Sequence, residues 1–212
     1  MNPKHLLFLI IISIFLKGCL FEKKNEEVID IPTPELIELG WSSFQSAKYS
    51  DSEKYFNELT SREDGYLVGH SGLGWTFLRT YKYQNARSEF NKFFSLDSLG
   101  VYAPADSLTR DVRAGQTLTF SALSEHPDVI TVSQGFVASN AVNNNWSFRF
   151  DRTLTVSDIR LLRAVSQVAL SNFADAYAMV RLIDPTFETD IATVEGRLAL
   201  IMKIEELMSA VK

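Results

Sequence analysis

From residue 36 onward, apolar and small side chains return every three or four residues, which is the spacing of one face of an α-helix. Thr33 and Pro34 indicate a helix start, because a hydroxyl can cap the first turn and proline needs no partner there. We therefore predict one helix over residues 35–47 and a second over about 50–60. The inward positions are Leu36, Leu39, Gly40, Ser43 and Phe44 in the first, and Ser52, Tyr55, Phe56 and Leu59 in the second.

The same pattern occurs again 34 residues later. The stretch LGWSSFQSAKYSDSEKYF, residues 39–56, aligns with LGWTFLRTYKYQNARSEF, residues 73–90. The matching positions are Gly40 and Gly74, Trp41 and Trp75, Tyr49 and Tyr83, Ser52 and Ala86, and Phe56 and Phe90. A helix–turn–helix unit with this period resembles the tetratricopeptide repeat (TPR). We expect the two glycines to let the helices of each pair cross closely, opposite Ser52 and Ala86.

The remainder of the chain is less regular. Residues 99–105 insert a loop, and helices are predicted over about 106–123 and 127–141. Residues 140–155 are rich in turn formers and then alternate around three aromatics, which favours a loop or a short extended segment. Another helix pair follows over 156–185, starting at Ser157 and Asp158. A last helix is expected over 189–211, with Ile191, Val194, Leu198, Ile201, Ile204, Met208 and Val211 directed inward.

These elements predict an all-α protein, and the resemblance implies a TPR-like solenoid of helical hairpins over residues 33–212. The expected units are repeats at about 33–66 and 67–98, an irregular pair at 104–141, a further repeat at 156–187, and a capping helix at 189–211.

The N-terminus has the features of a secreted lipoprotein. A short basic start precedes an apolar run of eleven residues, Leu6–Leu16, whereas crossing a bilayer needs about 20. The run ends in LKGC, which resembles a bacterial lipobox, although Lys17 departs from the pattern. The resemblance implies a signal peptide of residues 1–18, lipidation of Cys19 and a tether over 19–32. The alternatives are an uncleaved signal anchor and a signal peptide with an incidental cysteine. The expected location is the periplasmic side of the outer membrane rather than the inner membrane.

Charge and composition restrict the chemistry. The chain has 21 basic and 26 acidic residues, a net charge of −5, without a basic block, which argues against a nucleic-acid partner. His70 and His126 stand apart from other ligand-type residues, so we predict no metal and no cofactor. The stretch GHSGLG, residues 69–74, lacks the last glycine of a nucleophile elbow. We therefore predict no catalytic residue. A pocket that joined Asp151, Asp158 and His126 would instead indicate a hydrolase.

The candidate binding residues lie on the first helix of each pair. In TPR proteins this helix lines the concave groove, and a residue that follows the crossing glycine by one position turns about 100° toward it. The resemblance implies a groove that binds a partner protein, and Trp and Arg are favoured anchors in such interfaces. The residues are Ile37, Trp41, Phe44, Trp75, Leu78 and Arg79.

Two readings of the function follow from the sequence. The first is a non-enzymatic adaptor, anchored by its lipid, that holds a partner protein in the cell envelope through this groove. The second is an envelope lipoprotein that binds a small molecule or glycan through Trp146, Phe148 and Phe150. It also remains open that neighbouring helices cover both groove tryptophans.

Overall fold

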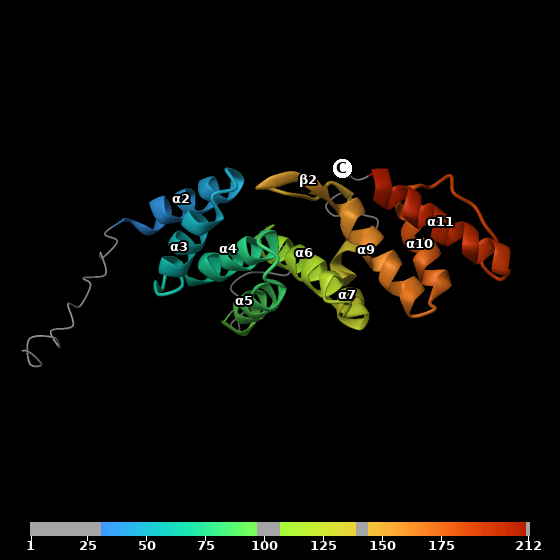
Figure 1. The fold of residues 1–212 in the computed structure, drawn as a ribbon, viewed down its shortest axis with the longest axis horizontal. Helices are drawn as coiled ribbons and strands as arrows, with labels where there is room; N and C mark the ends of the chain where they lie inside the picture. The colour runs from blue at the N-terminus through green and yellow to red at the C-terminus, as the bar shows by residue number, and fades with distance from the viewer. Residues whose placement is uncertain (1–30, 97–106, 139–143, 211–212) are drawn as a thin grey trace, which may run out of the picture. The chain divides into compact units, whose positions relative to one another are not determined.

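The computed structural model describes residues 31–96, 107–138 and 144–210, and in these ranges the chain is mostly helical, as predicted (Figure 1). All three ranges belong to one compact unit. The predicted signal peptide, Cys19, most of the tether, the 99–105 loop and Val211 lie outside the described residues. Among the residues described, there is no helix with the length and apolar character needed to span a membrane.

The two sequence repeats form the four predicted helices. These are α2 (Thr33–Gln45), α3 (Tyr49–Leu59), α4 (Tyr66–Arg79) and α5 (Tyr83–Leu96), and each packs against the next. The start of α2 differs in detail from the prediction. Thr33 makes no side-chain cap; its hydroxyl donates to Asp64 at 2.9 Å, which ties the start of α2 to the turn before α4.

Two further pairs follow. The first consists of α6 (Ser107–Ala122), α7 (His126–Val132) and the 3₁₀ turn η1 (Ser133–Phe136); the second of α9 (Val156–Ala169) and α10 (Phe173–Ile183). The helix predicted over 127–141 is therefore too long. Gly135 weakens a helix at this point, and two arginines of α9 bind the carbonyl groups that the shortened helix leaves free. Arg160 Nε donates to Phe136 O at 2.9 Å, and Arg163 donates to Ile130 O.

All four pairs use the same turn, although only two share a visible sequence repeat. In each turn one residue adopts the left-handed conformation, and the next N–H donates to a carbonyl five residues back, which is the Schellman arrangement that ends helices. The left-handed residues are Ala47, Tyr81, Ser124 and Ser171, with φ of 56°, 60°, 58° and 63°. The donor–acceptor pairs are Lys48–Ser43, Lys82–Phe77, Glu125–Phe120 and Asn172–Gln167, at 2.9, 2.9, 2.9 and 2.7 Å. The third pair, irregular in sequence, is therefore regular in its turn.

Phenylalanine rings, rather than bare backbone, fill the space that the repeat glycines leave. A side chain on Gly40 or on Gly72 would overlap the ring of Phe56, and one on Gly74 or Gly115 would overlap Phe90. Each ring thus lies between a glycine of the preceding helix and a glycine of the following one. The predicted close approach at Gly40 and Gly74 is real, but its partner is the aromatic ring.

A β-hairpin connects the third pair to the fourth. Strands β1 (Ser147–Phe148) and β2 (Asp151–Thr155) pair antiparallel, within the 140–155 segment where a short extended stretch was predicted. Residue Thr155 ends β2 and caps α9: its N–H and its hydroxyl both donate to Asp158 Oδ2, at 2.6 and 2.8 Å. The helix therefore begins at Val156, one residue before the predicted start.

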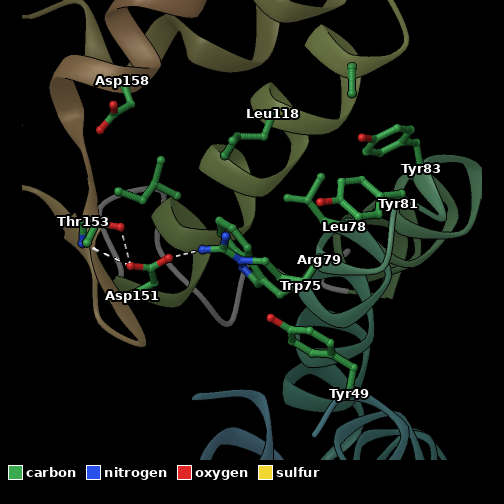
Figure 2. Close-up of a pocket in the computed structure, with 12 residues that line it drawn as sticks. Tyr49, Trp75, Leu78, Arg79, Tyr81, Tyr83, Leu118, Asp151, Thr153 and Asp158 are labelled. Carbon is green, nitrogen blue, oxygen red and sulfur yellow. Dashed lines mark hydrogen bonds and ion pairs between the residues drawn. The ribbon is translucent and has the colours of Figure 1, made fainter. Parts of the chain in front are cut away.

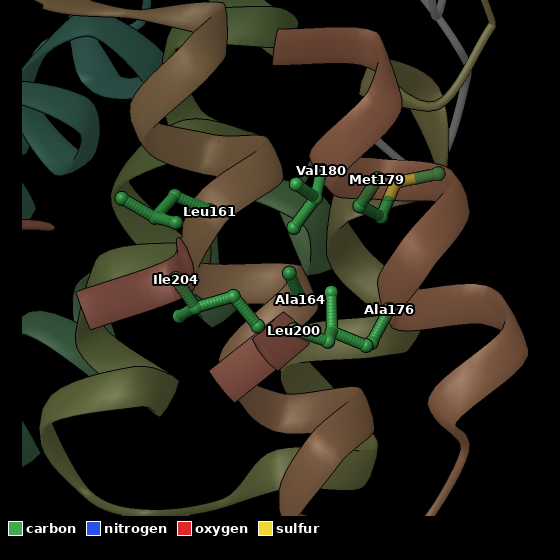
Figure 3. Close-up of a cluster of buried hydrophobic side chains, with 7 residues drawn as sticks. All are labelled: Leu161, Ala164, Ala176, Met179, Val180, Leu200 and Ile204. Carbon is green, nitrogen blue, oxygen red and sulfur yellow. The ribbon is translucent and has the colours of Figure 1, made fainter. Parts of the chain in front are cut away.

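The C-terminal helix α11 (Val194–Ala210) packs on α9 and α10. Figure 3 shows the buried cluster that joins them: Leu161, Ala164, Ala176, Met179, Val180, Leu200 and Ile204. The helix starts five residues later than predicted, and the predicted inward face is partly wrong, because Val194, Leu198 and Met208 are exposed. Apolar residues lie on several sides of α11, so periodicity alone does not identify the buried face.

Candidate functional site

The β-hairpin covers the face on which the binding groove was predicted. It reaches from α9 back to the end of α2 (Figure 1), where the ring of Phe150 stacks on Trp41 with centroids 3.7 Å apart and planes 6° apart. Phe148 stacks in the same way on Trp75, at 3.9 Å and 16°. The two tryptophans are only 6% and 1% exposed. The chain's own aromatic residues therefore occupy this surface.

A buried carboxylate contacts the residues at both ends of strand β1. Asp111 of α6 accepts a hydrogen bond from Trp146 Nε1 at 3.1 Å and another from Arg149 Nε at 2.9 Å. Burial raises the pKa of Asp111, and the charge of Arg149 and the two hydrogen bonds do not fully offset it. The two hydrogen bonds join α6 to the hairpin and give this carboxylate the partners that it needs, since an isolated buried carboxylate would be costly.

An ion pair forms a second link between the hairpin and the helices. Arg79, at the end of α4, pairs with Asp151 Oδ2 at the start of β2 (Figure 2). The other carboxylate oxygen accepts the N–H and the hydroxyl of Thr153, at 3.1 and 2.6 Å. Burial acts to raise the pKa of Asp151, but the bonds from Thr153 and the charge of Arg79 outweigh it and lower the pKa. Arg79 is therefore already neutralised within the chain.

Some of the predicted groove residues are buried beneath the hairpin, and others line an open cleft beside it. Trp41, Phe44 and Trp75 are buried, and all three have ring contacts with the hairpin. Ile37 is half-buried on α2. Leu78 and Arg79, together with an edge of Trp75, line an open cleft beside the hairpin.

The aromatic segment considered for a glycan is mostly inaccessible. Trp146 and Phe148 are buried, with Trp146 packed edge-on against Phe136 at 5.2 Å. Phe150 is half-buried against Trp41. The rings of this segment thus act as core, and they do not offer the open stacking platform that a sugar would require.

The open cleft has a volume of about 630 Å³ (Figure 2). The ends of α3, α4 and α5 form one side, α6 forms the floor, and β2 with the start of α9 forms the other side. Its lining residues are Tyr49, Trp75, Leu78, Arg79, Tyr81, Tyr83, Leu118, Ala122, Asp151, Thr153, Leu154 and Asp158. A concave site of this size with apolar walls and a few polar groups is typical of a ligand-binding surface.

Three tyrosines form one rim of the cleft. Tyr49 and Tyr83 begin α3 and α5, so they are equivalent in the sequence repeat, and Tyr81 is the left-handed residue of the turn between α4 and α5. Tyr81 is 78% exposed and lies edge-on to Tyr83. In the described part of the chain, none of the three hydroxyl groups has a hydrogen-bond partner. They are available to a bound molecule.

The opposite side carries a carboxylate with one unused oxygen. Asp158 Oδ2 caps α9 through Thr155, whereas Oδ1 has no partner among the described residues. His126 is not one of the lining residues; its Nδ1 lies 3.2 Å from Ser166 Oγ. The hydrolase arrangement of Asp151, Asp158 and His126 is therefore not assembled. In the ranges that the structure describes, no group of three or more His, Cys, Asp or Glu residues is placed to hold a metal.

Sequence reasoning missed the tyrosine rim and Leu118 of the floor. The repeat aligns Tyr49 with Tyr83 but does not indicate that they line a cleft, and Leu118 lies in an imperfect helical face that does not distinguish a lining residue from a core residue. Tyr81 occupies a turn position where glycine would be less strained, and its 78% exposure is known only from the structure.

Comparisons of the chain with protein-family models, with curated proteins and with solved structures found no match. The class of this protein therefore rests on its own geometry, which is that of an all-α protein built from antiparallel helix pairs with a β-hairpin packed on them.

Proposed function

We propose that this protein is a non-enzymatic TPR-like adaptor, held by a lipid in a bacterial cell envelope, that binds a segment of a partner protein in the open cleft. The observation that supports the proposal is that the hairpin covers one surface of the helices and leaves the adjoining cleft open. The hairpin fills the apolar face of the first two helix pairs, and the adjoining cleft of about 630 Å³ stays open with a tyrosine rim.

The repeat character is supported by sequence and geometry together. The period of 34 relates the first two pairs, and the same left-handed turn ends the first helix of all four described pairs. Solenoids of helical hairpins commonly present concave surfaces to protein partners. The departures are Asp64 and Ser98, which stand where a closing proline is frequent.

The envelope location depends on the N-terminal motif. Acylation of Cys19 would anchor the chain, and the tether of residues 19–32 would separate the helical part from the membrane surface. An acidic chain, with a net charge of −5, would gain little from anionic lipid, so the lipid itself would be the anchor. The proposal includes no nucleic acid, metal or cofactor.

A variant of the cleft floor tests the adaptor function. Leu118 lines the cleft and is only half-buried, so Leu118→Arg is expected to leave folding intact while its long side chain fills the cleft. Affinity isolation from detergent-solubilised envelopes should recover one specific partner with the wild-type chain and at least tenfold less with Leu118→Arg.

The matched control is Met202→Arg, a charge added at an exposed apolar position on α11, outside the cleft. It should recover the partner as the wild type does, and thermal unfolding should show all three chains folded. Recovery of no specific partner, or equal recovery by Leu118→Arg and wild type, would contradict the proposed function.

A further inference from the structure

The described residues that line the cleft have unused hydrogen-bonding groups, but the one cation among them, Arg79, is already paired. Arg79 is occupied by Asp151, whose two oxygens are both engaged by Arg79 and Thr153. What remains for a ligand is Asp158 Oδ1 on one side and the tyrosine hydroxyls on the other. The described lining residues carry one positive and two negative charges, so their balance is acidic.

We infer that the partner segment is basic: a Lys or Arg side chain of an extended stretch of the partner protein pairs with Asp158 Oδ1, and its apolar neighbours rest on the tyrosine rim. This rests on the proposed function and specifies the chemistry of the same site. An acidic segment would bring a second uncompensated negative charge beside Asp158, because Asp151 already neutralises Arg79.

The shape of the site fits a long cationic side chain. Leu118 and Asp158 line the same cleft (Figure 2), so the methylene stem of Lys or Arg can cover apolar surface while its head reaches the carboxylate. Hydrogen bonds to a charged group are about twice as strong as neutral ones. The net charge of −5 on the whole chain acts in the same direction, since it attracts a basic partner over longer range.

The apolar lining also favours a peptide over a glycan. The floor and sides expose Leu78, Leu118 and Ala122, which apolar and aromatic side chains bury favourably. A glycan would bring many hydroxyl groups against these surfaces, and hydroxyls left without partners are costly to desolvate. Peptide segments combine apolar side chains with one charge, as this lining requires.

A set of three labelled peptides tests the inference with the full chain in detergent micelles. The probes are fluorescein-labelled GWARAWG and its neutral and acidic counterparts GWAQAWG and GWAEAWG, and the measurement is fluorescence polarisation at low salt. The Arg peptide should bind about tenfold more tightly than the Gln peptide, and the Glu peptide should bind more weakly than both. The preference should decrease as salt is added.

Two variants assign the preference to Asp158. Asp158→Asn keeps a side-chain oxygen that can cap α9 but removes the charge, so it should bind the Arg and Gln peptides equally. Asp128→Asn is the matched control, because Asp128 also lies in the first turn of a helix, α7, but is outside the cleft. It should keep the full Arg preference. Leu118→Arg should lose binding of all three peptides.

Equal binding of the Arg and Gln peptides by the wild type, no binding of any peptide, or an Arg preference that survives in Asp158→Asn would overturn the inference. So would saturable binding of a neutral envelope glycan that Leu118→Arg abolishes. These failures are distinct from failure of the adaptor function, which is judged by partner recovery with Leu118→Arg. If Leu118→Arg abolished recovery of the partner and Asp158→Asn did not change it, the adaptor function would be retained and the preference for a basic segment would be rejected.

Discussion

Phe148→Ala is expected to lower the free energy of unfolding by about 3–5 kcal/mol, the usual cost of truncating a buried phenylalanine. The Phe148 ring is 0% exposed, stacks on Trp75 and lies edge-on to Trp41 and Phe44. Its removal would leave a cavity at the point where the hairpin meets both sequence repeats. Denaturant titration followed by tryptophan fluorescence measures the effect directly.

Phe150→Ala is the matched control on the same hairpin. Phe150 is half-buried and stacks on Trp41 alone at short distance, so its truncation should cost about 1–2 kcal/mol. If Phe148→Ala and Phe150→Ala both left the free energy of unfolding unchanged, the hairpin would not be part of the core, and the Trp41–Trp75 face would again be a candidate binding surface.

The second large effect is expected at Asp111. Asp111→Ala removes the acceptor of a buried indole N–H and the partner of Arg149. A buried donor left without a partner costs about 1–3 kcal/mol, and hydrogen bonds to charged groups contribute more than neutral ones. Because Arg149 is partly exposed and can be rehydrated, we expect a total loss of about 2–4 kcal/mol in the free energy of unfolding. Asp111→Asn, which keeps the acceptor for Trp146, should lose less than half as much.

The contribution of Asp111 to the free energy of unfolding changes with pH in a definite direction. Burial raises the pKa of Asp111 above its value in the unfolded chain. Such a carboxyl binds its proton more tightly in the folded state, so the folded state loses stability as the pH rises between those two pKa values. Asp111→Asn should lack this loss when stability is measured from about pH 4 to about pH 7. Identical pH profiles for the wild type and Asp111→Asn would contradict the assignment.

The hairpin explains how the first two helix pairs bury their inner face. Trp41 and Trp75 would otherwise expose a large apolar surface, which soluble proteins rarely do without a partner. Stacked and edge-on aromatic pairs stabilise by about 0.5–1.5 kcal/mol beyond the area they bury. The chain's own hairpin thus buries this face. The Arg79–Asp151 ion pair links the hairpin to α4 at the edge beside the cleft.

The sequence predicts well the helices and strands that depend on residues close together in the chain. The period of 34 places α2 to α5 correctly, and the alternation around Trp146 and Phe148 predicts the extended segment. Helix ends were less accurate. The predicted start of α9 was Ser157, whereas the helix begins at Val156 after a capping box that depends on the geometry of Thr155 and Asp158 together.

The contacts that define the candidate site were not predictable, because they join residues far apart in the chain. Phe150 meets Trp41, and Asp151 meets Arg79, across more than seventy positions, and nothing in either local pattern indicates the partner. The prediction of the buried face of α11 was partly wrong for another reason. Its apolar residues surround much of the helix, so only packing on α9 and α10 decides that Leu200 is buried and Leu198 is not.

The most direct measurement is site-specific photocrosslinking in living bacteria, with a photoreactive amino acid at Tyr81 on the cleft rim or at Met202 on α11. The account predicts a crosslink from position 81 to one envelope protein, its loss when Leu118→Arg is added, and no such product from position 202. A product that forms only from position 202, or one from position 81 that Leu118→Arg leaves unchanged, would contradict the claim that the cleft is the binding surface.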